Sequence, residues 1–240
     1  MTAFPTSAMV LAAGLGLRMR PITLAIPKPL VMVAGRSMLD RALDHLDTAG
    51  VEKTVVNAHW LADSIVEHFA RRPDVTVLRE ETLLETGGGV ANALPHLGPN
   101  PFYVVNGDIV WTNGAIPALS RLAGAWSRHR MDALLLLQPT ASAVGYDGKG
   151  DFFLDPTGVP RRRQGGEVAP FLFSGVQILH PRLFEGCPAG KFSLNLLYDR
   201  ALDEGRLFGL IHDGRWFHVG TPDALPEVEA RLAQKERTRT

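Results

Sequence analysis

Short apolar runs alternate with amphipathic segments along the first part of the chain. Ala8–Leu11, Phe102–Val105 and Leu134–Leu137 contain almost only apolar residues. Runs of this length and composition are typical of strands buried on both faces of a sheet. Thr54–Val56 and Val75–Leu78 are short and rich in β-branched residues, and we predict strands there as well.

The segments between these strands have apolar residues at helical spacing. Ser37 and Asp40 form a capping-box pattern at the start of one such segment, and Gly50 ends it. The alternation predicts a single α/β domain with a mostly parallel sheet and helices on both faces. The predicted helices are Leu39–Leu46, Leu61–Phe69, a segment led into by Gly87-Gly88-Gly89 and ending near Leu97, and Ile116–Trp126.

From about Ala141 the chain becomes richer in turns, and shorter strands are predicted. We found no internal repeat and no low-complexity linker, so this half continues the same domain and is expected to close over the first half. The predicted elements are strands at Phe152–Leu154, Ser174–Leu179, Leu207–Ile211 and Trp216–Val219, a helix from Ser193 to about Glu204, and a terminal helix opened by Thr221-Pro222.

The composition excludes several classes of protein. The 240 residues carry equal numbers of basic and acidic side chains, 25 of each, so no basic footprint indicates a nucleic-acid partner. The single cysteine, Cys187, permits no intrachain disulfide. Residues 1–7 show no signal-peptide pattern, and no apolar window approaches the roughly 18 residues of a membrane span. We therefore expect a cytoplasmic protein with no membrane partner, as a monomer or small homo-oligomer.

A candidate phosphate-binding loop follows the first predicted strand. Gly14 and Gly16 lie just after it, Arg18 comes next, and Lys28 stands between two prolines. Glycines let backbone N–H groups approach phosphate oxygens, and the cations supply countercharge. On these residues alone, a tight turn with solvated arginines is an equal alternative. The Walker and Rossmann fingerprints are absent, since no Gly-Lys-Ser/Thr follows and Met19 replaces the third glycine.

A longer pattern extends this loop. Gly14-x-Gly16-x-Arg18-x-x-Pro21-x-Thr23, followed by Pro27-Lys28-Pro29-Leu30, resembles the signature of the sugar-1-phosphate nucleotidylyltransferases. The resemblance implies a Rossmann-like, glycosyltransferase-A-like fold with a nucleotide-binding half (about 1–140) and a sugar-binding half (about 141–240). It runs over nearly the whole chain through Leu84-Glu85-Thr86-Gly87-Gly88-Gly89, Asn106-Gly107-Asp108, Phe173-Ser174-Gly175 and Trp216-Phe217-His218-Val219-Gly220-Thr221.

The same resemblance implies roles for individual residues in making a nucleotide-sugar and pyrophosphate. Both reacting phosphates are anionic, so catalysis depends on positioning and charge neutralisation and needs no protein nucleophile. Arg18, Lys28 and Asp108 are the expected catalytic residues, and Asp108 is also the expected ligand of a divalent metal. The nucleotide is expected to contact Leu11, Ala12, Ala13, Gly14, Gly16, Arg18, Lys28, Glu80, Thr86 and Gly87.

Glu80 stands where many members of the family have a glutamine that reads the base. A carboxylate only accepts hydrogen bonds, so it could accept from uracil N3–H or from guanine, and it disfavours cytosine. The alternative is a solvated glutamate at a strand end. The triple glycine and Gly150-Asp151-Phe152 resemble family members that use UTP and N-acetylmuramate 1-phosphate in cell-wall recycling. GTP with mannose 1-phosphate, or another hexose 1-phosphate, remains an alternative.

Two positions depart from the family pattern. His218 stands where a second metal-binding aspartate is expected, and imidazole suits softer ions than Mg²⁺. We therefore expect Asp108 and His218 at a site for Mg²⁺, with Mn²⁺ or Co²⁺ as alternatives; Asp213 could substitute only if its loop folds back. A non-catalytic nucleotide-sugar sensor is a second hypothesis, motivated by His218. Phe173 replaces a sugar-binding asparagine of some relatives.

Other polar residues are then needed to hold the sugar. We predict that Asn106, Asp151 and Ser174 do so, because polar side chains at strand ends can hold sugar hydroxyls or an acetamido group. The run Arg161-Arg162-Arg163 admits two interpretations, a solvated loop or an attraction for an acidic sugar.

Overall fold

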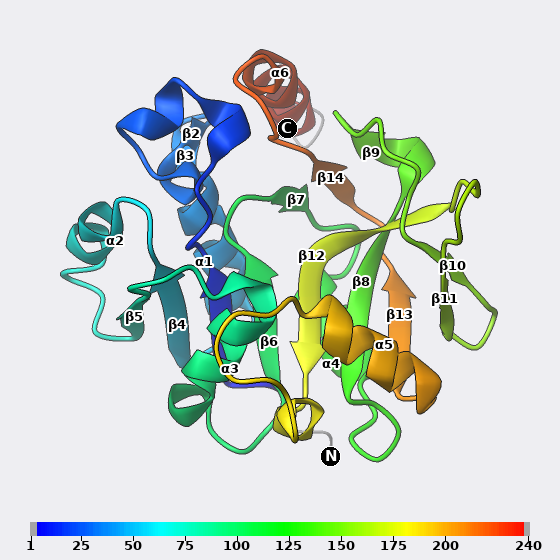
Figure 1. Ribbon diagram of the computed structural model, residues 1–240. Helices are drawn as coiled ribbons and strands as arrows, with labels where there is room; N and C mark the ends of the chain where they lie inside the picture. The colour runs from blue at the N-terminus through cyan, green and yellow to red at the C-terminus, as the bar shows by residue number, and fades with distance from the viewer. Residues whose placement is uncertain (1–3, 238–240) are drawn as a thin grey trace.

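A continuous nine-stranded sheet forms the centre of the computed structural model (Figure 1), which describes residues 4–237. Residues 1–3 and 238–240 of the predicted domain lie outside the described part. The strands are β1 (Ser7–Leu11), β2 (Met32–Val33), β3 (Arg36–Ser37), β4 (Lys53–Ala58), β5 (Val75–Arg79), β6 (Phe102–Asn106), β7 (Val110–Thr112), β8 (Ala133–Pro139), β9 (Ala143–Val144), β10 (Phe152–Leu154), β11 (Pro160–Arg162), β12 (Phe171–Leu179), β13 (Leu207–Ile211) and β14 (Arg215–Phe217).

The sheet has the order β11-β10-β12-β6-β1-β4-β5, and β8 pairs with both β12 and β13. Its β6-β1-β4-β5 part is parallel, whereas β12 runs antiparallel to β6 and β8. The predicted α/β class is confirmed, but β12 from the second half lies between strands of the first. In the parallel part, Leu11 is paired with Asn57 on one side and Asn106 on the other, so three strand ends meet at one edge.

Helices cover both faces of this sheet, as the predicted alternation requires. β1 is buried on both sides, with Ala8 and Val10 in one apolar cluster and Met9 in the other. The first cluster includes residues of α1 (Met38–Thr48), α2 (Ala62–His68) and α4 (Ala118–Ala125). The second includes residues of α3 (Glu85–Leu97) and α5 (Asn195–Asp203), the pair nearer the viewer in Figure 1. Near the C-terminus follows α6 (Ala224–Arg237), and 3-10 turns lie at Leu17–Met19, Ile22–Leu24, Lys28–Leu30, Thr140–Ser142 and Pro181–Phe184.

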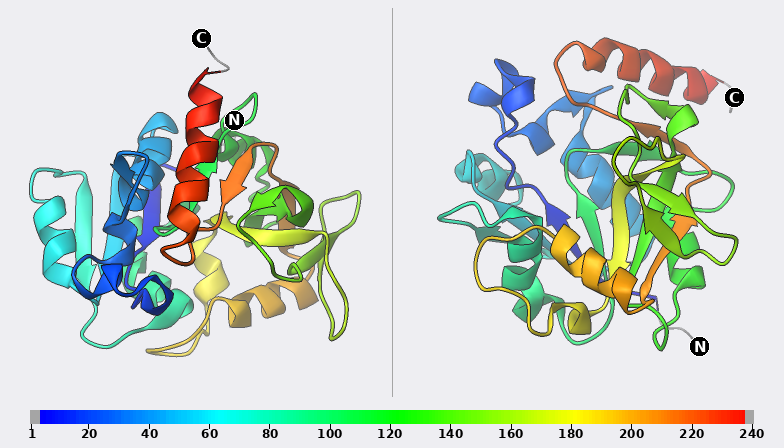
Figure 2. Two further views of the ribbon diagram at one scale, coloured as in Figure 1. Left: turned by 90° about the horizontal axis from the view of Figure 1, so that it is seen from above. Right: turned by 45° about the vertical axis from the view of Figure 1, so that its right-hand side comes forward.

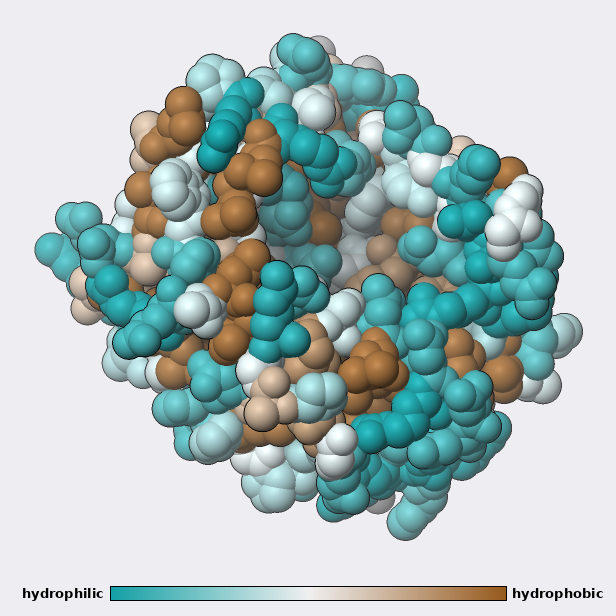
Figure 3. Space-filling model, viewed as in Figure 1, coloured by the Kyte–Doolittle hydropathy of each residue, from teal (hydrophilic) through white to brown (hydrophobic). Residues whose placement is uncertain are grey.

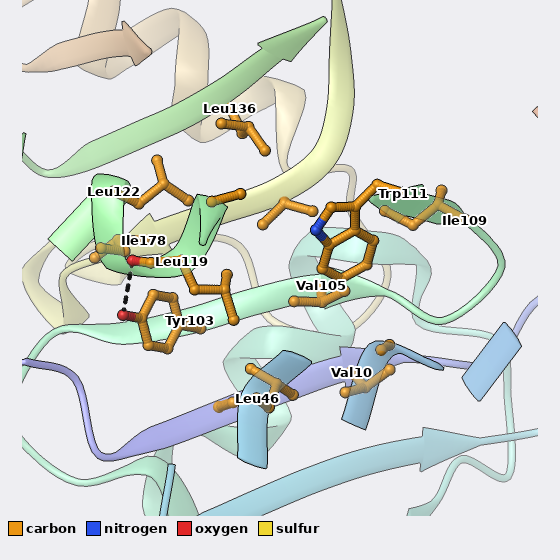
Figure 4. Close-up of a cluster of buried hydrophobic side chains, with 14 of the residues drawn as sticks. Val10, Leu46, Tyr103, Val105, Ile109, Trp111, Leu119, Leu122, Leu136 and Ile178 are labelled. Carbon is orange, nitrogen blue, oxygen red and sulfur yellow. Dashed lines mark hydrogen bonds between the residues drawn. The ribbon is translucent and has the colours of Figure 1, made fainter. Parts of the chain in front are cut away.

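The first cluster fixes β6 against α4 (Figure 4). The fully buried Tyr103 on β6 donates its hydroxyl hydrogen to the Leu119 carbonyl oxygen on α4, at 3.1 Å. Burial of a hydroxyl without a partner would be costly, so this bond makes a large polar side chain compatible with the core.

The C-terminal helix packs on a second, three-stranded sheet, β7-β14-β9, which is separate from the nine-stranded sheet (Figure 2). Val228 on α6 is buried against Val33, Phe217 and Val219, and Glu229 Oε1 accepts from Ala34 N at 2.9 Å. The helix begins at Ala224 rather than at Thr221-Pro222, and the triple glycine lies inside α3 rather than before it. Among residues 4–237 no helix combines the length and apolarity required to cross a bilayer.

Candidate active site

A cleft of about 640 Å³ opens at the carboxyl ends of β1, β4 and β6, where open α/β sheets bind ligands. It is visible as the hollow in the centre of Figure 3. Its walls come mainly from the loop after β1 and from the start of α3. The lining residues are Leu11, Ala12, Ala13, Gly14, Gly16, Leu17, Arg18, Met19, Lys28, Pro29, Asn57, Leu83, Glu85, Thr86, Asn106, Asp108, Ser193 and Gly220.

The glycine loop requires glycine at Gly16. Its φ of +61° is unfavourable for other residues, and a Cβ there would lie 3.0 Å from Thr23 Cγ2 and 3.1 Å from Lys28 Cβ. Thr23 Oγ1 donates to the Gly16 carbonyl oxygen at 2.8 Å. The loop thus turns back on itself and brings the exposed Arg18 and the buried Lys28 to the same cleft.

Lys28 and Asp108 form an ion pair in the cleft. Lys28 Nζ lies 2.6 Å from Asp108 Oδ2, although 80 residues separate them. The side chain of Lys28 is only 10% exposed and that of Asp108 is 38% exposed. The parallel pairing of β1 with β6 brings them together, and Gly107 N donates to the Leu11 carbonyl oxygen at 2.9 Å. A cation and a carboxylate therefore stand together where anionic phosphates would enter.

Glu80 does not line the cleft. Its carboxylate is buried and accepts hydrogen bonds from Asn57 Nδ2 at 2.6 Å and from Leu84 N at 3.0 Å. This geometry does not support the prediction that Glu80 reads the base, because its two oxygens are engaged within the protein. Asn57, which the sequence analysis missed, lines the cleft instead. The available signal was a polar residue at the end of a buried strand, the same signal that Asn106 gives.

The triple glycine is closely packed against a second backbone segment. Gly87 N and Gly88 N both donate to the Phe192 carbonyl oxygen, at 2.9 and 3.1 Å. A Cβ at Gly88 would lie 2.1 Å from the Gly190 carbonyl oxygen, and one at Gly87 would overlap the Phe192 ring. Residues 188–193, here called the strap, therefore lie directly on the first turn of α3. This geometry does not support the predicted contact of Gly87 with the nucleotide, because its N–H is bonded to Phe192 and it does not line the cleft.

Leu194, the residue that follows the strap, is bonded to Thr86, which does line the cleft. Thr86 Oγ1 accepts from Leu194 N at 3.0 Å, and the strap residue Ser193 reaches the cleft wall. The sequence analysis missed Ser193, since no local pattern marks it. Two N–H groups of the first turn of α3, those of Gly87 and Gly88, are therefore used within the protein.

Of the three predicted sugar-binding residues, only Asn106 lines the cleft. Ser174 is 1% exposed, and its carbonyl oxygen accepts from Trp216 Nε1 at 2.8 Å. Asp151 is exposed on the surface and accepts from Phe173 N at 2.8 Å. The structure therefore does not bring Asp151 and Ser174 to the described cleft. Ser174 lies at the register shift of β12, where its Oγ accepts from Val176 N at 3.3 Å, and the Asp151 carboxylate is bonded to the backbone of β12.

Two of the three arginines in the run 161–163 pair with neighbouring carboxylates. Arg161 pairs with Glu167 at 2.9 Å, and Arg162 contacts Asp199. Arg163 donates from Nε to the Gly150 carbonyl oxygen at 3.1 Å. This arrangement favours the interpretation as a surface segment, since two of the three charges already have partners.

His218 is half-buried beside Gly220, which lines the cleft, and is not itself among the lining residues. A Cβ at Gly220 would lie 2.3 Å from His218 Nε2, and the His218 ring stacks on Trp216 with centroids 5.9 Å apart. Burial, together with the positive charges of Lys28 and Arg18, lowers the pKa of His218. The alternative ligand Asp213 instead pairs with Arg121 at 2.7 Å and does not line the cleft.

These residues fit a divalent ion only in part. Within the described residues, no group of three or more His, Cys, Asp or Glu side chains is arranged to hold a metal. Asp108 does fit the mode in which Mg²⁺ is held by one or two carboxylates together with substrate phosphates and waters. A metal here would depend on the nucleotide for most of its ligands.

The chain resembles known proteins along nearly its full length. A family model described as a MobA-like NTP transferase domain matches residues 8–146. An N-acetylmuramate alpha-1-phosphate uridylyltransferase of Caulobacter vibrioides is 43% identical over 241 residues, which cover 98% of this chain and 100% of that protein. The enzyme of the same description from Neisseria meningitidis serogroup B is 36% identical over 229 residues, covering 93% and 96%.

Solved structures agree on the fold. The crystal structure of HddC from Yersinia pseudotuberculosis, complexed with GMP-PN, has a TM-score of 0.75 at 22% identity, covering 95% of this chain and 99% of that one. The sequence motifs, the cleft at the strand ends and the full-length relatives lead to one assignment. This chain belongs to the MobA-like NTP transferase family and, within it, to the sugar-1-phosphate nucleotidyltransferases.

Proposed function

We propose that this protein transfers the uridylyl group of UTP to N-acetylmuramate 1-phosphate, giving the UDP-sugar and pyrophosphate. The two full-length relatives carrying that description support the choice of substrates. The reaction belongs in the cytoplasm, where nucleoside triphosphates are available, and it fits a step in peptidoglycan recycling.

The observation that carries the proposal is the Lys28–Asp108 pair beside the glycine loop. A phosphate oxygen of the sugar phosphate attacks the α-phosphorus of UTP, a new P–O bond forms, and the bond to the β-phosphate breaks so that pyrophosphate leaves. Lys28 holds the two anionic groups together against their repulsion, and Arg18 with the loop N–H groups holds the leaving phosphates. Fixed charges of this kind lower the barrier because they need no reorganisation during the reaction.

We also propose that UTP binds together with a divalent ion, Mg²⁺ or, because of His218, Mn²⁺ or Co²⁺. When bound, the ion neutralises charge on the phosphates. Asp108 would hold it, with His218 close by. Lys28 must then exchange part of its contact with Asp108 for contact with phosphate, which its flexible stem permits.

A panel of triphosphates and sugar 1-phosphates, read by pyrophosphate release in several metals, tests the substrates. We expect UTP with N-acetylmuramate 1-phosphate to give the highest kcat/KM, and activity to vanish in EDTA. If GTP with mannose 1-phosphate is used at least as well, the choice of substrates is wrong. A mannose-1-phosphate guanylyltransferase of Mycobacterium tuberculosis, 27% identical, motivates that arm.

The hypothesis of a non-catalytic sensor finds no support in this geometry, because the lysine and the aspartate expected for turnover are both in the cleft. It predicts nucleotide binding without pyrophosphate release in any metal. The same panel therefore separates it from the enzyme.

A further inference from the structure

Two buried polar side chains form a pair at the cleft: Asn57 lines it, and Glu80, which does not, is bonded to Asn57. Asn57 is 3% exposed and Glu80 is 6% exposed. Asn57 Nδ2 donates to Glu80 Oε1 at 2.6 Å, which joins the end of β4 to the residue that follows β5. Two polar side chains buried in this way are costly unless every polar atom has a partner.

Each outer atom of the pair accepts a backbone N–H from a different wall of the cleft. Asn57 Oδ1 accepts from Ala12 N at 2.8 Å, in the loop after β1. Glu80 Oε2 accepts from Leu84 N at 3.0 Å, at the start of α3. The four side-chain atoms are therefore all bonded, and the chain Ala12–Asn57–Glu80–Leu84 spans the base of the cleft.

We propose that Asn57 and Glu80 are positioning residues that fix the width of the nucleotide site, rather than readers of the base. This inference rests on the proposed function. Ala12 and Thr86 both line the cleft, and the pair connects the loop that carries Ala12 to the loop that ends at Leu84, two residues before Thr86. A site held at its final width before the ligand arrives avoids the cost of ordering those loops on binding.

The direction of the hydrogen bonds makes this role testable. The N–H groups of Ala12 and Leu84 both donate, so the pair must accept at both ends and supply one donor between its members. Asparagine with glutamate meets this requirement, and so does aspartate with glutamine in the reverse order. Either single exchange fails, because Glu80→Gln sets two N–H donors against each other and Asn57→Asp sets two carboxylates against each other.

The experiment compares wild type, Asn57→Asp, Glu80→Gln and the double variant by pyrophosphate release at varied UTP. We expect each single variant to raise the KM for UTP about ten-fold, as the loss of one buried hydrogen bond would. We expect kcat and the KM for the sugar phosphate to change much less. The double variant should return the KM for UTP to near the wild-type value. The exposed neighbour Glu81 supplies the matched control, Glu81→Gln, which should leave all three constants unchanged.

A double variant as impaired as the single ones would overturn the proposal, because it would mean that the carboxylate of Glu80 or the amide of Asn57 itself contacts the substrate. Wild-type turnover is measured first with UTP and GTP, so an error in the proposed substrates is seen separately, and the series is run with whichever triphosphate is used. Should the single variants not fold, amide exchange in the unaltered, ligand-free protein decides. Protection of both Ala12 N–H and Leu84 N–H is expected, and fast exchange of either would refute the pairing.

Discussion

Breaking the Lys28–Asp108 ion pair from its two ends should affect stability unequally. In Asp108→Ala, the Lys28 ammonium, whose side chain is 10% exposed, loses its counter-ion while remaining largely buried. In Lys28→Met, the aliphatic stem is kept, and Asp108 is left with a side chain 38% exposed that water can solvate. Stranding one partner of a buried pair costs about 3–5 kcal/mol, whereas surface pairs contribute about 0–1 kcal/mol.

This pair is intermediate, so we expect Asp108→Ala to lower the free energy of unfolding by about 2 kcal/mol and Lys28→Met by less than about 1 kcal/mol. At about 2–4 °C per kcal/mol for a chain of this size, the Tm should fall by about 4–8 °C and by less than about 4 °C. Activity should fall about 10²- to 10³-fold in both.

The assay is thermal unfolding by circular dichroism in EDTA, without nucleotide, so that no metal substitutes for the lost charge. Asp63→Ala is the control, since Asp63 pairs with Arg79 on the surface and its side chain is 92% exposed. Its Tm should stay near that of wild type. Equal losses in the two cleft variants, or a larger loss in Lys28→Met, would refute the argument from burial.

Two further predictions concern packing and pH. Gly88→Ala should destabilise the fold by about 1–3 kcal/mol and weaken turnover, because its Cβ would meet the Gly190 carbonyl oxygen at 2.1 Å. Gly124→Ala is the control: this position in α4 has nothing within 4 Å, so the substitution should stabilise the fold by about 0.5–1 kcal/mol. The free energies of unfolding of both variants are compared by urea unfolding. Burial, with the charge of Arg182 nearby, lowers the pKa of His180 to about 4. Because the folded protein disfavours its protonated form, its contribution, at most about 3 kcal/mol, is complete above about pH 6.5 and is lost as the pH falls towards 4. In His180→Asn, whose amide oxygen can still accept from Arg182 N, the Tm should fall less steeply over that range; equal slopes would contradict this assignment.

Local patterns predicted most elements of the fold but not their order in the sheet. The apolar runs at β1, β6 and β8 were recognisable because a strand buried on both faces carries apolar residues at successive positions, with no alternation of apolar and polar residues. The position of β12, antiparallel between β6 and β8, depends on long-range pairing that its own residues do not encode. The short strands β7 and β9 lacked a local signal for the same reason, since each is defined by its pairing with β14.

At the site, the spacing of the motifs indicated which residues lie near the cleft, but it was a poorer guide to the role of each residue. Lys28 and Asp108 follow different strands, and the family resemblance implied that both belong to one site; the structure shows them paired in the cleft. Glu80 and Gly87 fit the same motif spacing, but their polar groups are bonded to Asn57 and Phe192. Sequence spacing cannot distinguish a polar side chain that contacts a ligand from one that is hydrogen-bonded to a neighbouring loop, because side chains of both kinds lie at the same strand ends.

The lining of the cleft suggests that nucleotide and sugar recognition are separable. Apart from Ser193 and Gly220, every lining residue belongs to the first half of the chain. We therefore expect the nucleotide to occupy most of the described cleft and the sugar to meet the protein on the side where the strap and Gly220 border it. The Asn57–Glu80 pair, as proposed above, would set the width of the nucleotide part. Substitutions in the strap should then alter the KM for the sugar phosphate more than that for the triphosphate, whereas Asn57 and Glu80 variants should do the reverse.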